Sequence, residues 1–345
     1  MKKNVILADC PPEEIADFCK GMEEVSGKKY EILSTFNAKK VKGSWKKRKT
    51  YVQYFSFPLS IVLHRKQYDI VAGWQQFYAI NFAFFSKLGG GVKKTNKLVV
   101  VNFTYKEKKG LLGKLYFRFM KWTVTGSYID YFHVPSHKYA ERCHEELGIP
   151  MEKFIITTFG IPDILAKWKD SVAPMRNYSL AIGRSNRDFD FLVRVWSRPE
   201  MKDKSLVILT DVWKPSVALP KNILHFDNVF GDDTIPWIKG CEILVVSIDD
   251  GNICSGDTVL LKGMRSSKTV VVTVPSTLGE MYLRHEEDGI CLAKNEESFA
   301  AYVKSLLGDE VKRKLIGMAA RQSYLEKFSR YTLGSKIAEY AKLKL

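Results

Sequence analysis

The chain has 345 residues and a hydrophobic fraction of 46%, which is enough apolar material for packed cores and excludes an intrinsically disordered protein. Its length fits two α/β domains, because single hydrophobic cores stop growing below this size. The 54 Lys and Arg exceed the 38 Asp and Glu, for a formal net charge of +16, so the protein attracts polyanions.

Six cysteines are scattered without the paired spacing of a zinc site or the density of a disulfide framework, which indicates a reducing compartment. The histidines show no metal spacing either, so we expect no metal site. The first apolar run is too short for a signal-peptide core, and no run approaches the roughly 20 residues of a spanning helix. We therefore expect a cytoplasmic protein that meets a membrane only from its surface.

Strand-like apolar runs alternate with helix-length segments, a pattern that predicts parallel sheets. The pattern restarts after Pro174, behind a polar and proline-punctuated hinge at 164–175. The expected strands are 4–9, 68–74, 97–103 and 131–136 in the first half, and 178–185, 205–211, 242–248 and 268–274 in the second.

The fold class predicted from this pattern is α/β, with two Rossmann-like domains facing each other across a cleft. We place the first domain at 1–168 and the second at 169–329. The tail 330–345 is helix-like and is expected to pack back on the first domain.

Most of the positive charge belongs to the first half, since residues 1–170 hold 29 Lys and Arg against 16 Asp and Glu, a net charge of +13. No acidic residue occurs between Glu31 and Asp69, and aromatic residues are interleaved with the cations there. Such a segment suits anionic lipid, although it also suits nucleic acid. The cations at its centre are Lys46, Lys47, Arg48 and Lys49.

A second basic segment, 106–124, has helical periodicity, with cations on one face and an apolar face that includes Leu111, Leu115 and Phe119. One interpretation is a helix that lies in a membrane surface. The alternative is an ordinary amphipathic helix that packs on the sheet.

His133 follows a strand-like pair of aromatic residues near the expected cleft, which makes it a candidate for contact with an acceptor molecule. The alternative is a packed, hydrogen-bonded core histidine.

The sequence GRSNRDFD at 183–190 brings two arginines to the end of a predicted strand, where open α/β sheets place their ligands. Arginine forks match phosphate oxygens, so Gly183, Arg184 and Arg187 predict a pyrophosphate clamp. The alternative is a surface turn with solvated arginines.

The segment 249–273 contains Ser255 and Gly256 directly before a helical pattern that leads into a buried strand. Free amides at a helix start, beside a glycine, form an anion site, which makes Ser255 and Thr258 candidate phosphate or ribose contacts. A simple helix cap at Ser255 is the alternative. Asp249 and Asp250, in the preceding loop, either orient sugar hydroxyls or are ordinary turn residues.

Four segments, in order, resemble the GT-B glycosyltransferases, specifically the retaining family 4 group. The family's paired glutamates are not found, and the position of the second, which usually holds the nucleotide ribose, is Lys262. The usual glycine-rich loop after the first strand is replaced by DCPPEE at 9–14. The resembling segments are 134–163, 183–189, 224–247 and 255–292.

The resemblance implies a glycosyltransferase that moves a sugar from a UDP- or GDP-sugar to a lipid-linked or cell-surface glycan acceptor, with retention of configuration. Because the sequence shows no cluster of metal ligands, we expect a reaction without a metal. The basic segments predict peripheral attachment to the inner face of the cell membrane. Arg184, Arg187 and Asp250 would act on the reacting centre. A sugar-nucleotide epimerase of the same architecture and a non-catalytic nucleic-acid- or lipid-binding protein are the alternatives. The implied donor-binding residues are Gly183, Arg184, Arg187, Asp249, Ser255, Gly256, Asp257, Thr258 and Lys262.

Overall fold

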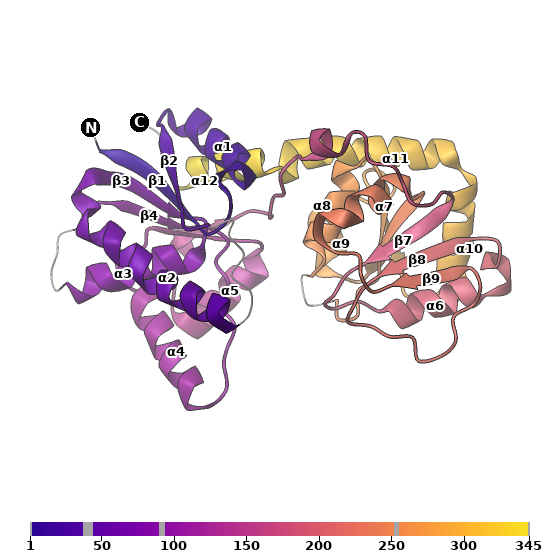
Figure 1. Cartoon of the computed structure of the whole chain (residues 1–345), viewed down its shortest axis with the longest axis horizontal. Helices are drawn as coiled ribbons and strands as arrows, with labels where there is room; N and C mark the ends of the chain where they lie inside the picture. Colours follow the sequence, from indigo (N-terminus) through magenta and orange to yellow (C-terminus); the bar gives the residue numbers. More distant parts are fainter. Residues whose placement is uncertain (1, 37–43, 90–93, 252–254, 344–345) are drawn as a thin grey trace. The chain divides into compact units, whose positions relative to one another are not determined.

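The computed structural model describes residues 2–36, 44–89, 94–251 and 255–343, without the side chains of residues 44–50 and 167. The chain divides into two compact units, one formed by Met1–Pro162 with Arg330–Leu345 and the other by Asp163–Ser329. Each unit is built on a six-stranded parallel sheet with surrounding helices, as Figure 1 shows. The predicted α/β class is confirmed.

The sheet of the first unit has the order β2-β1-β3-β4-β5-β6. Its strands are β1 (Lys3–Ala8), β2 (Tyr30–Ser34), β3 (Tyr68–Gly73), β4 (Lys97–Val100), β5 (Tyr131–Val134) and β6 (Phe154–Ile156). Its helices are α1 (Ala16–Ser26), α2 (Ser44–Leu63), α3 (Gln76–Leu88), α4 (Gly110–Val124), α5 (His137–Leu147) and α12 (Arg330–Tyr340).

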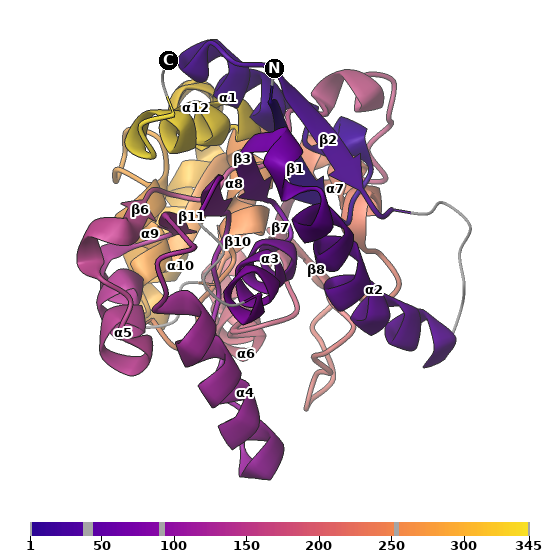
Figure 2. The same ribbon diagram turned by 90° about the vertical axis from the view of Figure 1, so that its left-hand side faces the viewer.

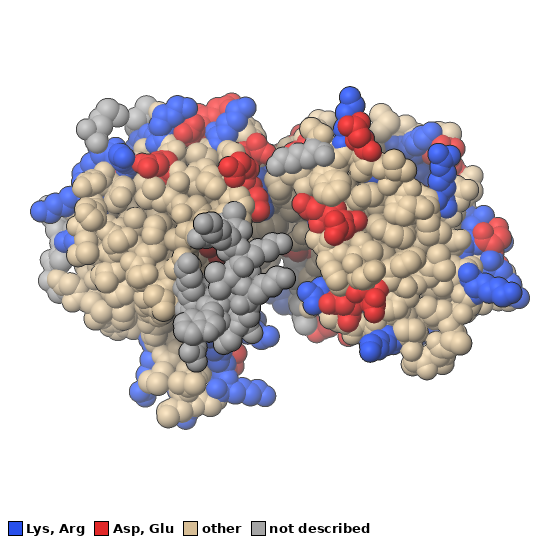
Figure 3. All heavy atoms as spheres, in the orientation of Figure 1, with Lys and Arg blue, Asp and Glu red and all other residues tan. Residues whose placement is uncertain are grey.

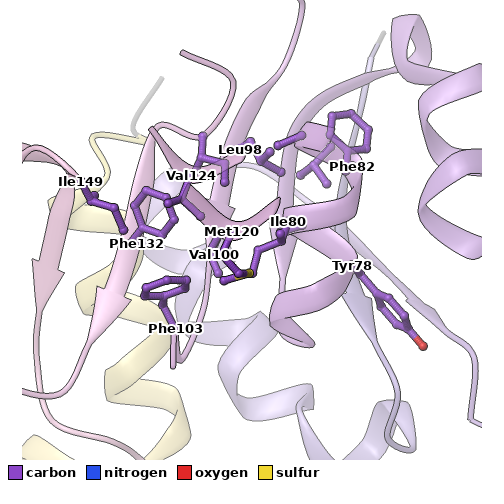
Figure 4. Close-up of a cluster of buried hydrophobic side chains, with 14 of the residues drawn as sticks. Tyr78, Ile80, Phe82, Leu98, Val100, Phe103, Met120, Val124, Phe132 and Ile149 are labelled. Atoms are coloured by element: carbon purple, nitrogen blue, oxygen red, sulfur yellow. The ribbon is translucent and has the colours of Figure 1, made fainter. Parts of the chain in front are cut away.

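Alternation along β1 divides the core of the first unit into two layers. Val5 and Leu7 pack with residues of α3 and α4 in the cluster that Figure 4 shows in part. Ile6 and Ala8 point to the other face and pack with residues of α1 and α12. Both faces of the sheet are therefore covered, as a parallel sheet requires.

The C-terminal helix α12 completes the first unit by packing on α1, and the two helices lie side by side in Figures 1 and 2. Glycines allow their close approach. A Cβ atom added at Gly334 would lie 2.1 Å from the carbonyl oxygen of Phe18, and one added at Gly21 would lie 2.1 Å from that of Tyr331.

The sheet of the second unit has the order β12-β11-β10-β7-β8-β9. Its strands are β7 (Tyr178–Ile182), β8 (Ser205–Leu209), β9 (Ile223–Phe226), β10 (Ile243–Val246), β11 (Thr269–Val274) and β12 (Ile290–Ala293). Its helices are α6 (Phe189–Ser197), α7 (Thr234–Gly240), α8 (Asp257–Arg265), α9 (Thr277–Tyr282), α10 (Glu296–Gly308) and α11 (Glu310–Ser323).

Each sheet has a point where the chain reverses the direction in which strands are added, and such switch points are where open parallel sheets bind ligands. In the first unit this point lies between β1 and β3, and in the second it lies between β7 and β10. The carboxyl ends of these four strands therefore mark the two edges to search for a site.

We expect Gly334→Ala to lower the free energy of unfolding by about 1–3 kcal/mol, because the added methyl group meets the α1 backbone. Urea denaturation of the full chain measures the change. Gly308→Ala is the matched control, since a Cβ atom there meets nothing within 4 Å. Equal stability of the two variants would contradict the close contact.

Candidate functional site

A cavity of about 350 Å³ lies at the switch point of the second sheet. It is formed by the segment after β7, the residues before and at the start of α7, and the start of α8. Every predicted donor-binding residue except Asp249 lines it. The lining residues are Ile182, Gly183, Arg184, Ser185, Arg187, Leu209, Thr210, Val229, Phe230, Gly231, Thr234, Ser255, Gly256, Asp257, Thr258, Val259 and Lys262.

Within the part of the chain that the structure describes, carbonyl oxygens alone hold the guanidinium of Arg187 in this cavity. It donates to the carbonyls of Ser185 at 2.8 Å, Ile182 at 3.3 Å and Ser255 at 3.4 Å. Among the described residues, no carboxylate forms a salt bridge with it. Burial lowers the pKa of Arg187 to about 10, and the charge of Asp257 opposes this shift. Arg187 is thus a charged group at neutral pH that carbonyl dipoles orient without neutralising it.

Two glycines make room for this guanidinium. A Cβ atom at Gly183 would lie 2.5 Å from Nε of Arg187, and one at Gly256 would lie 2.5 Å from its Nη2. Both glycines also have positive φ, +156° and +107°, which residues other than glycine rarely adopt. The close contact and the backbone conformation both require glycine here.

Arg184, the other predicted arginine, has a different environment. Its Nε and Nη2 donate to the two carboxylate oxygens of Asp211 at 2.7 and 2.8 Å, and 67% of its side chain is exposed. Exposed ion pairs of this kind contribute little to stability, so an anionic ligand can compete with Asp211 for the guanidinium of Arg184. Asp211 was not among the predicted site residues, although its position as the last residue of the predicted strand 205–211 was a usable signal.

Helix α8 adds a further cation and one acid. The ammonium of Lys262 donates to the carbonyl of Gly231 at 2.7 Å and to Oγ1 of Thr234 at 3.2 Å. Burial lowers the pKa of Lys262 and raises the pKa of Asp257. The lining therefore carries Arg184, Arg187 and Lys262 against one carboxylate, an arrangement that favours an anionic ligand.

Asp249 and Asp250 lie beside this cavity but do not line it. The side-chain amide of Asn186 accepts from the backbone N–H of Asp250 at 2.8 Å and donates to its carbonyl at 2.9 Å. This pair of bonds fastens the loop to the turn after β7. The role of both carboxylates toward a sugar stays a prediction, and residues 252–254 of the same loop lie outside the described part.

His133 is buried in the first unit, with 1% of its surface exposed. Its Nδ1 accepts from the backbone N–H of Asn102 at 3.1 Å, and its Nε2 donates to the carbonyl of Thr157 at 2.9 Å. Both ring nitrogens are thus engaged inside the unit. The ring is a hydrogen-bonded core histidine and not a contact for an acceptor molecule.

The predicted membrane residues of 106–124 separate into two groups. Leu111 and Leu115 are 75% and 52% exposed at the start of α4, which extends away from the rest of its unit in Figure 2. Phe119 is instead partly buried, with its ring 5.0 Å from that of Phe84 in α3. The helix thus packs on the unit along part of its length and leaves Leu111 and Leu115 exposed. The side chains of Lys46, Lys47, Arg48 and Lys49 lie outside the described part.

No helix of the described residues is long and apolar enough to cross a membrane. No group of three or more His, Cys, Asp or Glu within the described ranges is placed to hold a metal ion.

No family model and no curated protein matches the chain. Solved structures match it over nearly the whole length. Anabaena Alr3699/HepE in complex with UDP-glucose is 12% identical, with a TM-score of 0.61 over 98% of this chain and 99% of that one. The fold is GT-B.

Two further structures share this GT-B fold. A glycosyltransferase from Rickettsia africae ESF-5 is 16% identical, with a TM-score of 0.63 over 99% of both chains. WaaG, a glycosyltransferase involved in lipopolysaccharide biosynthesis, is 16% identical, with a TM-score of 0.57 over 97% of this chain and 98% of that one. At these identities the likeness shows the GT-B fold and leaves the family 4 resemblance as a prediction.

Burial lowers the pKa of His133 from 6.5 to about 4. Between these values the unfolded chain binds more protons than the folded one, so stability is lost as the pH falls from 6.5 toward 4. We expect a loss of about 3 kcal/mol from this ring. Urea denaturation over this pH range measures it, and His133→Gln should show a shallower decline. The same decline in both proteins would contradict the assignment.

Proposed function

We propose that this protein is a glycosyltransferase that transfers a sugar from a nucleotide diphosphate, such as a UDP- or GDP-sugar, to a hydroxyl group of an acceptor. The observation that carries the proposal is the guanidinium of Arg187, held by carbonyl oxygens at the switch point of the second sheet. A diphosphate is the ligand whose charge and size suit three cations around a cavity of about 350 Å³. The neighbouring HepE structure with UDP-glucose supports the same donor class.

In this reaction the bond between the anomeric carbon and the diphosphate oxygen breaks, the acceptor oxygen forms a new bond to that carbon, and the acceptor proton passes to the departing diphosphate. Negative charge develops on the departing diphosphate. Arg187 and Arg184 would neutralise that charge. Cations of the protein would then replace a divalent metal, and we propose a metal-independent reaction. Retention of configuration follows from the family 4 resemblance.

We expect Arg187→Lys to weaken UDP binding about tenfold, because a lysine cannot reproduce the two-pronged contact of a guanidinium with phosphate. Calorimetry with UDP in a chelating buffer measures the affinity and also tests binding without metal. Arg194→Lys is the matched control, since Arg194 pairs with Glu296 and does not line the cavity. Wild-type affinity in Arg187→Lys would contradict the donor site. A need for added metal would contradict the metal-independent reaction.

We further propose that the acceptor is lipid-linked or a cell-surface glycan, and that the protein attaches peripherally to the inner face of the cell membrane. Support comes from α4, whose first turns expose Leu111, Leu112 and Leu115 beside Lys114. In Figure 3, Lys and Arg side chains gather around the N-terminal end of this helix. Exposed leucines next to cations suit a surface that is both apolar and anionic.

Replacing Leu111 and Leu115 by Asp should reduce binding to anionic vesicles, because each inserted leucine contributes about 2 kcal/mol of apolar burial. Flotation with phosphatidylglycerol-containing liposomes measures the bound fraction. The control replaces Val311 and Leu315, an exposed apolar pair with the same spacing on α11, by Asp. Equal recovery of the two variants would mean that α4 does not insert.

A further inference from the structure

The amino ends of four strands in the first sheet carry lysines that neither the donor site nor α4 uses. The chain reads KKN at the start of β1, KKY at the start of β2, RKQY before and into β3, and KKTNK before and into β4. Because parallel strands begin at the same edge of a sheet, the topology brings these four segments together. This lysine row consists of Lys2, Lys3, Lys28, Lys29, Lys66 and Lys94.

The lysine row crosses neighbouring strands, in the order β2-β1-β3-β4. Neighbouring strands lie about 4.8 Å apart, so the row extends over roughly 15 Å across the sheet. A cavity of about 770 Å³ lies in it, where the segments before β1 and β2 meet. In Figure 3, Lys and Arg side chains gather on the side of the first unit where Figure 1 marks the N-terminus.

Four members of the lysine row pair with carboxylates of the same edge. Two of these lysines are largely exposed, since 92% of the Lys29 side chain and 63% of the Lys3 side chain meet solvent. Exposed pairs contribute little to stability, so an incoming anion can compete for these ammonium groups. The pairs are Lys3–Glu31 at 3.1 Å, Lys28–Asp69 at 3.2 Å, Lys29–Glu23 at 2.8 Å and Lys94–Asp130 at 2.6 Å.

The remaining cations leave this edge with an excess of positive charge. Among the described residues, Lys2 and Lys66 have no carboxylate partner, and Lys2 donates to the carbonyl of Thr95 at 3.4 Å. Lys97, the first residue of β4, donates to the carbonyl of Lys342 at 3.0 Å, which brings two more cations together. The cations that adjoin these segments in the sequence but lie outside the described part are Lys93 and Lys344.

The lysine row lies at the opposite end of α4 from its exposed leucines. Helix α4 ends beside the row, since the ammonium of Lys94 donates to the carbonyl of Ser127, three residues after Val124, at 2.9 Å. With 15 residues, α4 begins roughly 20 Å away from this end. A membrane that takes up Leu111 and Leu115 would therefore leave the lysine row accessible to a soluble partner.

We propose that the lysine row binds a linear chain of phosphate groups, such as a nucleic-acid strand or inorganic polyphosphate. Ammonium groups are compact point charges that suit phosphate oxygens, and a row of them follows a chain of charges. Release of the counterions condensed on such a chain favours binding. Tyr30, the aromatic residue that lines the cavity, is buried and offers no face for base stacking, so the contact would not depend on base sequence. The proposal does not depend on the proposed transfer reaction.

The test is fluorescence anisotropy of the full chain with a labelled oligothymidine of about 20 nucleotides, measured over a range of salt concentrations. Saturating UDP in every sample keeps the donor cavity occupied. We expect Lys2→Gln, Lys29→Gln and Lys66→Gln together to reduce the slope of log affinity against log salt by about 2, because each phosphate contact contributes about 0.7. The control replaces Lys202, Lys214 and Lys221, exposed lysines of the second unit, by Gln and should keep the wild-type slope.

Competition against the labelled strand identifies the source of the phosphate chain. Unlabelled oligothymidine and inorganic polyphosphate are compared at equal phosphate concentration, and the better competitor is the favoured source. Poly-L-glutamate of the same charge should compete at least about tenfold more weakly, because a carboxylate offers fewer acceptor oxygens to an ammonium group than a phosphate does.

Four outcomes would overturn the proposal: no binding of either phosphate chain by the wild type at low salt, an unchanged slope in the triple variant, an equal loss in the control, or equal competition by poly-L-glutamate. The last result would indicate an acidic protein partner. UDP calorimetry on the triple variant should give wild-type affinity, which separates this test from failure of the donor site. Lys29→Gln alone should lower the slope by about 0.7 and provides a second variant if the triple variant is unstable.

Discussion

The central constraint of this structure is a positive charge that backbone carbonyls hold in place, with no salt bridge to it among the described residues. The guanidinium of Arg187 needs hydrogen-bond acceptors because it is partly removed from water, and the acceptors it finds are backbone carbonyls. Those carbonyls belong to the turn after β7 and the segment before α8, so the cation joins the two walls of the cavity. Gly183 and Gly256 follow from the same requirement, since any side chain there would displace the guanidinium.

The two sheets offer similar scaffolds, with different charged residues after their strands. The second sheet places Arg184, Arg187 and Lys262 around one cavity, whereas the first places Asp9 and two glutamates after β1. Parallel sheets direct loops from distant parts of the chain to the same edge, so the loop residues decide what is bound.

The helical stretch 106–124 shows how one amphipathic pattern can serve two purposes along its length. Helical spacing predicts the helix and its apolar face, and the structure has α4 at Gly110–Val124. Its second half buries Phe119 against α3, whereas Leu111 and Leu115 at its start have no part of the described unit to cover them. Periodicity alone does not distinguish these two halves, because neighbouring elements decide which apolar residues are covered.

The sequence by itself determined the α/β class, the eight strands with strong apolar runs and the residue types of the anion site, because hydrophobic periodicity and glycine–arginine patterns are local signals. It did not reveal β2, β6, β9 or β12, which are short and carry weaker apolar patterns. Only the tertiary structure distinguished Arg184, which pairs with Asp211, from Arg187, which is bound by carbonyls. Only the tertiary structure showed that His133 is buried. Such differences depend on partners distant in sequence, since burial and charge compensation are properties of the packed chain.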